Sequence, residues 1–98
     1  MSLISVGGEV DLANADLLAA FIAGNCRPGD ELVFDLAGLS FMDCSGVNVL
    51  VRCARQAAGV RLAEARGGPA RLLEALRMHV HDTVEQALAA RPTSWRRS

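Results

Sequence analysis

The stretch at residues 31–46, ELVFDLAGLSFMDCSG, decides the fold of this chain. Its first part, residues 31–36, is a short and nearly continuous apolar run, which is typical of a parallel strand buried on both faces. Residues 37–46 are expected to form a loop that enters an amphipathic helix over residues 44–58. The inward positions of this helix follow the i, i+3, i+4, i+7 spacing and are Val47, Leu50, Val51 and Ala54. A buried strand followed by such a helix predicts an α/β domain.

The same alternation of strands and helices continues on both sides of this stretch. The expected strands span residues 3–10, 31–36, 60–63 and 78–80. We expect the first strand to bend at Gly7-Gly8, because glycine inside a strand marks a bulge or a turn in the backbone. The pattern predicts a mostly parallel four-stranded sheet with about four helices. Residues 1–90 are expected to form one domain, followed by a flexible tail at residues 91–98 that contains Trp95.

Three more helices are expected from their apolar stripes and their start and stop residues. The first is capped by Asn14, ends at Gly24 and turns inward the four apolar residues Leu17, Leu18, Phe21 and Ile22. The next begins near Pro69, which suits a first helical turn, and its inward residues are Leu72, Leu73 and Leu76. For the last helix we expect Asp82 as the cap, with Glu85 completing a capping box.

Composition limits the classes of function. The 98 residues are 51% hydrophobic and 21% charged, and the formal net charge is −1. This balance argues against a general nucleic-acid-binding protein, which needs a surplus of Lys and Arg. Residues 1–49 nevertheless hold seven acids and one base, a net of −6, whereas residues 50–98 hold four acids and nine bases, a net of +5. The chain has no Lys, so a Schiff-base mechanism is excluded.

The cysteines and histidines do not predict a metal centre. Cys26, Cys44 and Cys53 lack the spacing of metal ligands, and an odd count without a signal peptide indicates a reduced, cytoplasmic protein. His79 and His81 would share one face of a strand, but two nitrogen ligands without a third make a weak site. No apolar run approaches the length of about 18 residues that a membrane span needs. We therefore expect no metal, no cofactor and no membrane span.

The loop after residues 31–36 is the first place to look for a site, because parallel sheets place their sites beyond the carboxyl ends of the strands. Asp43, Ser45 and Gly46 lie there, at the start of the expected helix. From position alone, Ser or Asp at a helix start is most often only a cap. Cys44 is expected to fill space as a small apolar residue, since no base or cation lies near it in the sequence.

These residues also resemble a known family. The run FDLAGLSFMDCSGVNVLVRCARQA is similar to the signature of STAS domains, in which a strand is followed by the element D-x-S-G and a helix; here the element is Asp43-Cys44-Ser45-Gly46. A second match is Gly8-Glu9-Val10-Asp11, which resembles the G-E-L-D turn of the family. The resemblance spans residues 4–88. The chain departs from the family in lacking a full strand before the G-E-x-D strand, so we expect the first family strand to be truncated, and in lacking Asn-Pro in AEARGGP.

The resemblance implies an anti-sigma factor antagonist, a protein that binds an anti-sigma factor serine kinase and thereby frees a sigma factor. It implies that the kinase phosphorylates Ser45, that phosphorylation ends the binding, and that a phosphatase restores it. The free protein is expected to be a monomer. The residues that we expect to contact the partner are Asp11, Asp43, Cys44, Ser45, Gly46 and Asn48.

Two other functions remain open from the sequence. The first is a STAS adaptor that uses no phosphoserine and binds an ATPase subunit of a lipid transporter or another scaffold. The second is an enzyme with Ser45 or Cys44 as nucleophile, which has little support, because the chain has no G-x-S-x-G elbow and no evident triad. We therefore expect a binding protein rather than an enzyme.

Overall fold

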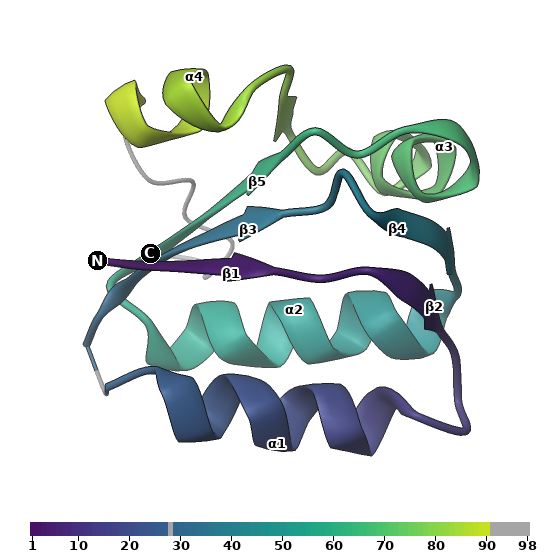
Figure 1. Ribbon diagram of the computed structural model, residues 1–98, viewed down its shortest axis with the longest axis horizontal. Helices are drawn as coiled ribbons and strands as arrows, with labels where there is room; N and C mark the ends of the chain where they lie inside the picture. The colour runs from purple at the N-terminus through teal and green to yellow at the C-terminus, as the bar shows by residue number, and fades with distance from the viewer. Residues whose placement is uncertain (28, 91–98) are drawn as a thin grey trace.

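Four parallel strands form the main sheet of the computed structural model, which describes residues 1–27 and 29–90 (Figure 1). Their order across the sheet is β1-β3-β5-β6, and each neighbouring pair is parallel. The strands are β1 (Ser2–Ser5), β3 (Glu31–Asp35), β5 (Gly59–Ala63) and β6 (Val80–His81). The predicted α/β class and the mostly parallel four-stranded sheet are confirmed.

Helices cover both faces of this sheet. α1 (Ala15–Asn25) and α2 (Cys44–Gln56) lie together below it in Figure 1, and α3 (Gly67–Ala75) and α4 (Val84–Ala89) lie above it. Because each face is covered, the central strand is buried on both sides: Val33 and Phe34 of β3 have no exposed surface. Phe34 belongs to the larger core under α1 and α2, and Val33 packs with Ala87 of α4.

A second, two-stranded sheet lies beyond the carboxyl ends of β1 and β3. It consists of β2 (Gly8–Val10) and β4 (Leu39–Met42), which also run parallel. At the bend between the two sheets the backbones of Gly7 and Gly38 come close, since a Cβ on Gly38 would lie 3.4 Å from the Gly7 Cα. The Gly8 N–H donates to the Gly38 carbonyl at 2.9 Å, and Gly8 has a φ of +78° that favours glycine.

This second sheet corrects two expectations about strands. Residues 3–10 do not form one bent strand, because β1 pairs with β3 whereas β2 pairs with β4. The loop expected at residues 37–46 contains β4, whose two central residues are exposed and whose short length hid its strand pattern. A strand of four residues, β1, precedes the G-E-x-D strand, and its short length agrees with the expected truncation of the first family strand. The last strand, β6, starts two residues later than expected.

Three leucine and phenylalanine positions differ from the expected helix faces. On α1, Ile22 is buried but Leu17 and Phe21 are 71% and 53% exposed. Leu73 of α3 is buried, whereas Leu76, directly after the end of α3, is 47% exposed. The core-facing side of α1 is formed instead by Ala15 and Ile22, with Leu18 and Ala19 partly buried against the core.

The start of the last helix lies one residue later than expected. The cap of α4 is Thr83, whose hydroxyl accepts the Gln86 N–H at 3.1 Å, and not Asp82. Gln86 also accepts the backbone N–H of Asp82 at 3.2 Å. Thr83 and Gln86, rather than Asp82 and Glu85, thus make the forward bond of a capping box, while the return bond from the Gln86 side chain goes to the N–H of Asp82, one residue before the cap.

Arg61 is a buried charge that the sequence analysis missed. This residue of β5 is 3% exposed and donates to the carbonyls of Ala87 and Leu88, at 2.8 and 3.1 Å, and to the Glu31 carboxylate. The two carbonyls lie at the end of α4, so Arg61 ties this helix to the sheet and supplies a charge favoured at a helix C-terminus. Its signal in the sequence is an Arg inside the apolar strand VRLA.

Some expectations fall on residues that the structure does not describe. The tail at residues 91–98 with Trp95 lies outside the described residues, as does Pro28. Among the helices that are described, none combines the length and the apolar composition that crossing a bilayer requires.

Candidate functional site

The candidate site is built where β2 and β4 end side by side. Val10 and Met42 are paired residues of the two strands, and each is followed by an aspartate, Asp11 or Asp43. The Asp43 N–H donates to the Val10 carbonyl at 3.2 Å, which extends the pairing by one step. The structure thus brings the G-E-V-D and D-C-S-G segments, about 30 residues apart in the chain, to one edge of the domain (Figure 1).

Asp43 is the N-cap of α2. Its carboxylate Oδ1 accepts the backbone N–H of Ser45 at 2.8 Å, and its carbonyl accepts the N–H groups of Gly46 and Val47 at 3.1 and 3.3 Å. A carboxylate in this position satisfies a donor that the helix itself leaves free and also interacts favourably with the helix dipole. The capping role left open between Asp43 and Ser45 therefore belongs to Asp43.

Ser45 lies two residues after the cap, in the first turn of α2. Its side chain is partly exposed, and within residues 1–27 and 29–90 its Oγ makes no hydrogen bond. Its own backbone N–H is already bonded to Asp43. The fold therefore fixes the backbone of Ser45 but leaves the hydroxyl available for chemistry.

Asp11 orders the turn between β2 and α1. Its Oδ1 accepts the Ala13 N–H at 2.9 Å, and its carbonyl accepts the N–H groups of Asn14 and Ala15 at 3.2 and 2.9 Å. Asn14 is the N-cap residue of α1 as expected, and its carbonyl accepts the N–H groups of Leu17 and Leu18 at 3.0 and 3.2 Å, but its side chain makes no capping hydrogen bond. Its side chain instead accepts the Asp11 N–H at 2.9 Å and donates to the Glu9 carbonyl at 2.8 Å, so it holds the turn against β2.

Gly46 is buried and its lack of a side chain has a reason inside the domain. A Cβ at this position would lie 2.6 Å from Met42 Cγ and 2.9 Å from Val10 Cγ1. Such distances are shorter than atoms normally approach, so a larger residue forces Met42 or Val10 to move. Glycine thus lets the first turn of α2 pack directly on the ends of β2 and β4.

Two further predicted contact residues, Cys44 and Asn48, are exposed on α2. Asn48 lies three residues after Ser45, so the two side chains are neighbours on the helix surface. The structure therefore brings together all six predicted contact residues at the start of α2 and the adjoining turn, with Gly46 beneath the surface. They are Asp11, Asp43, Cys44, Ser45, Gly46 and Asn48.

Sequence reasoning missed the apolar residues around this site. Leu12 is 82% exposed directly after Asp11, and Phe41 is 48% exposed in β4. The signal for Leu12 is a large apolar residue inside the otherwise small and polar turn DLAN. Phe41 gave none, because its strand was expected to be a loop.

The other thiols and the histidines lie elsewhere. Cys26 and Cys53 line a groove between α1 and α2, and burial raises the pKa of both thiols. The rings of His79 and His81 meet edge to face with their centres 4.5 Å apart, and burial lowers the pKa of His81. Across the part of the chain that the structure describes, no three His, Cys, Asp or Glu side chains are grouped closely enough to hold a metal ion.

Comparison with known proteins agrees with this arrangement. The family model of the STAS domain matches residues 1–89. The chain belongs to the STAS domain family. This STAS domain is also 37% identical to the anti-sigma-F factor antagonist RsfA of Mycobacterium tuberculosis, in strain CDC 1551 / Oshkosh and equally in strain ATCC 25618 / H37Rv. Each alignment covers 90% of this chain and 77% of the relative.

Proposed function

We propose that this STAS domain is an anti-sigma factor antagonist whose binding to its partner is switched by phosphorylation of Ser45. In this proposal the partner is an anti-sigma factor that is itself a serine kinase, binding frees a sigma factor, and a phosphatase reverses the modification. The proposed partners act on transcription, so we also place the protein in the bacterial cytoplasm. The similarity to proteins named anti-sigma-F factor antagonists supports the first part.

The observation that carries the proposal is the free Ser45 hydroxyl. A serine at a helix start normally serves as a cap, but here Asp43 accepts the Ser45 N–H and the Oγ has no partner among the described residues. The hydroxyl is therefore not needed to hold α2 in place. A kinase can use it as the phosphate acceptor without removing an interaction that the fold depends on.

The position also explains how a phosphate is tolerated. A phosphoserine carries about −1.5 to −2 charges at neutral pH. The first turn of a helix favours negative charge, because its free N–H groups and the helix dipole point towards it. Phosphorylation is therefore expected to leave the domain folded and to act on the interface instead.

Release follows from the charges that surround the modified serine. Asp43 is two residues away, and Asp11 lies at the end of the neighbouring strand. A kinase that phosphorylates Ser45 must also hold the nucleotide phosphates opposite its hydroxyl. The new phosphate then faces negative charge from its own domain and from the nucleotide, and burying unpaired charge in an interface costs several kcal/mol at the order-of-magnitude level.

Each of the other contact residues has a proposed part. Asp11 and Asp43 order the two turns and present negative charge to the kinase, while Cys44 and Asn48 supply exposed contact surface beside Ser45. Gly46 lets the first turn of α2 pack closely on the ends of β2 and β4, and this packing fixes the position of Ser45 relative to the two strands. No enzymatic role is proposed, because His79 and His81 come from the β6 segment, which packs with β5, α3 and α4, whereas Ser45 is on α2.

Phosphate mapping tests the proposal directly. Incubated with its kinase and Mg-ATP, the wild-type protein is expected to gain one phosphate, on Ser45, and Ser45→Ala is expected to gain none. Ser40→Ala is the matched control, since Ser40 is an exposed serine on β4 of the same site, and it is expected to be phosphorylated normally. Phosphate located mainly on another residue contradicts the assignment.

Binding measurements test the switch itself. Ser45→Asp is expected to weaken binding of the anti-sigma factor at least tenfold, which corresponds to about 1.4 kcal/mol. Treating the phosphorylated wild-type protein with the phosphatase is expected to restore its affinity. Unchanged binding by Ser45→Asp, together with a transporter ATPase subunit or scaffold as the bound protein, contradicts the switch and supports the adaptor function.

A further inference from the structure

Large apolar side chains are exposed on the two segments that lead into the site. Leu12, between β2 and α1, is 82% exposed, and Phe41 on β4 is 48% exposed. Leu17 and Phe21 on α1 are 71% and 53% exposed. Side chains this exposed contribute little to the core, and apolar residues gathered on one surface often mark an interaction site.

The strand pairing places Leu12 and Phe41 at the same edge as Ser45. Phe41 is paired with Glu9, and the next pair along the strands is Val10 with Met42. Leu12 is the second residue after Val10, and Ser45 is the third residue after Met42. Two apolar side chains therefore come from the two chain segments that meet at the phosphorylation site.

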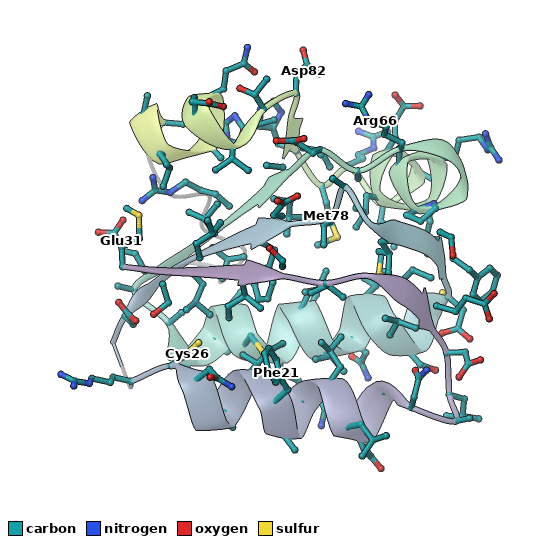
Figure 2. All side chains as sticks on the ribbon, viewed as in Figure 1. Phe21, Cys26, Glu31, Arg66, Met78 and Asp82 are labelled. Carbon is teal, nitrogen blue, oxygen red and sulfur yellow. The ribbon has the colours of Figure 1, made fainter. Side chains whose placement is uncertain are left out.

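α1, which follows Leu12 in the chain, carries two more exposed apolar side chains. Leu17 and Phe21 are four residues apart and therefore share a face of the helix. The core-facing residues of α1 are Ala15 and Ile22, with Leu18 and Ala19 partly buried, so the face of Leu17 and Phe21 is not used for packing within the domain. Figure 2 shows Phe21 on the side of the sheet that carries α1 and α2, away from Arg66 and Asp82.

The charge on the two segments that meet at Ser45, residues 8–26 and 39–51, has one sign. Glu9 and Asp16 are exposed and Asp11 and Asp43 partly exposed, whereas the chain has no Lys or Arg before Arg27. Arg27 follows the end of α1, and Leu12 precedes its start, so this cation is at the opposite end of the helix. A partner that covers the apolar residues must therefore meet carboxylates at their rim, and complementary potential requires cationic groups there.

We propose that Leu12 and Phe41 are the apolar anchors of a docking surface around Ser45, which Leu17 and Phe21 extend along α1, and that it fits a protein face with apolar sockets surrounded by basic side chains. This inference rests on the proposed function, because it gives the chemistry of the partner whose release Ser45 controls. The anchors supply affinity because their apolar surface is removed from water when the partner binds. The carboxylates at the rim raise the association rate.

A binding assay with anchor variants tests the docking surface. The probe is a purified anti-sigma factor kinase that binds the wild-type protein, and the variants are Leu12→Ser, Phe41→Ser and the double variant. The double variant is expected to weaken binding at least tenfold, mainly through faster dissociation. Leu76→Ser is the matched control, since Leu76 is similarly exposed at 47% but follows α3 on the other side of the sheet, and it is expected to change binding less than threefold.

A salt series tests the charge of the partner. The association rate constant of the wild-type protein is expected to fall between about 0.05 and 0.5 M salt, because the Debye length shrinks over this range. Asp11→Asn removes the charge, but its amide oxygen can still accept the Ala13 N–H, so the turn is retained. It is expected to lower the rate at low salt and to approach the wild-type rate at high salt. A rate independent of salt contradicts a basic partner face.

The outcomes separate this inference from the proposed function. The docking surface is overturned if the double variant binds the kinase with the affinity of wild type, or loses no more affinity than Leu76→Ser does. This conclusion holds even if Ser45→Asp still releases the kinase. If wild type binds no anti-sigma factor kinase, the proposed function fails and the docking surface with it. Sedimentation velocity tests whether the surface binds a second copy of the chain. If the wild type dimerises with rising concentration and the double variant does not, the surface belongs to a dimer, and the proposal of a basic protein partner is overturned.

Discussion

The end of the domain around Ser45 and the packing of α4 on the sheet use charged side chains in opposite ways. Asp43 is partly exposed and bonds to the backbone of a residue two positions away. Arg61 is 3% exposed and bonds to groups that lie 26 to 30 residues away in the chain, on β3 and α4. One charge shapes a local turn at the surface, and the other joins distant elements inside the protein.

The difference indicates where the domain can change without unfolding. Around Ser45, short-range bonds to Asp11 and Asp43 hold the backbone, while the hydroxyl and the apolar side chains remain unused by the fold. Around Arg61, the side chain itself is the connection, and its removal takes a donor from two carbonyls of α4, of which Ala87 then keeps only the N–H of Ala90. Substitutions at the two regions are therefore expected to separate stability from binding.

The largest loss of stability is expected for Arg61→Met. Methionine fills part of the space but cannot donate to Ala87 or Leu88, so the free energy of unfolding is expected to fall by about 3 kcal/mol. Chemical denaturation followed by circular dichroism measures this change. At temperatures where the variant is folded, phosphorylation of Ser45 is expected to continue.

Arg71→Met is the matched control for this loss. Arg71 is an exposed residue of α3, and exposed substitutions of this kind usually change stability by less than about 0.5 kcal/mol. Equal losses in the two variants contradict the role given to Arg61 in holding α4.

Next in size is the effect of Gly46→Ala. The new methyl group meets Met42 and Val10 at distances that force the neighbours to move, so the expected loss of stability is about 1–3 kcal/mol. Gly24→Ala provides the contrast, because nothing lies within 4 Å of a Cβ at this position of α1. Alanine there is expected to raise the stability by about 0.5–1 kcal/mol through its higher helix propensity. A Gly46→Ala variant as stable as wild type shows that Met42 adapts freely.

A smaller effect is expected at Asp43. Asp43→Ala removes the acceptor for the Ser45 N–H and is expected to cost about 1 kcal/mol, whereas Asp43→Asn keeps a capping oxygen and is expected to cost less. Thermal melting of the two variants measures the difference. Equal losses in both indicate that the charge, and not the hydrogen bond, supports the start of α2.

The sequence predicted the regular parts of the fold well for a physical reason. β3 is continuously apolar because both of its faces are buried, and the inner positions of α2 repeat with the helical period. β4 was missed because its burial runs buried, exposed, exposed, buried, which matches neither strand pattern. Leu17 and Phe21 were assigned to the core because periodicity identifies an apolar face without showing whether another element covers it.

The candidate site was predicted in position more than in detail. The element D-C-S-G at a helix start located Ser45, but only the hydrogen bonds show that Asp43 takes the capping role. The close contacts that explain Gly46 come from β2 and β4, and one of these strands was unrecognised. Asp82 was preferred over Thr83 because both residue types cap helices, and the sequence does not fix the first turn to one residue.

The smallest effect on stability is expected for Ser45→Asp, the variant expected to impair binding strongly. A carboxylate in the first turn of α2 is favoured by the helix dipole, whereas repulsion from Asp43 acts against it. Because the two contributions oppose each other and the Ser45 Oγ has no partner to lose among the described residues, the change is expected to stay within about 0.5 kcal/mol.

Ser45→Asn isolates the charge in this comparison, since it has nearly the same size as the aspartate variant. Both are expected to melt within about 4 °C of wild type, which is the shift that 0.5 kcal/mol gives at most in a domain of this length. Only the aspartate is expected to weaken kinase binding tenfold or more. A large drop in the melting temperature of both variants contradicts the claim that the Ser45 hydroxyl does not stabilise the fold. Ser45 then belongs with Arg61 among the residues that stabilise the fold. If a well-folded Ser45→Asn loses as much binding affinity as Ser45→Asp, release is caused by the size of the side chain and not by its charge, because the two variants differ only in charge.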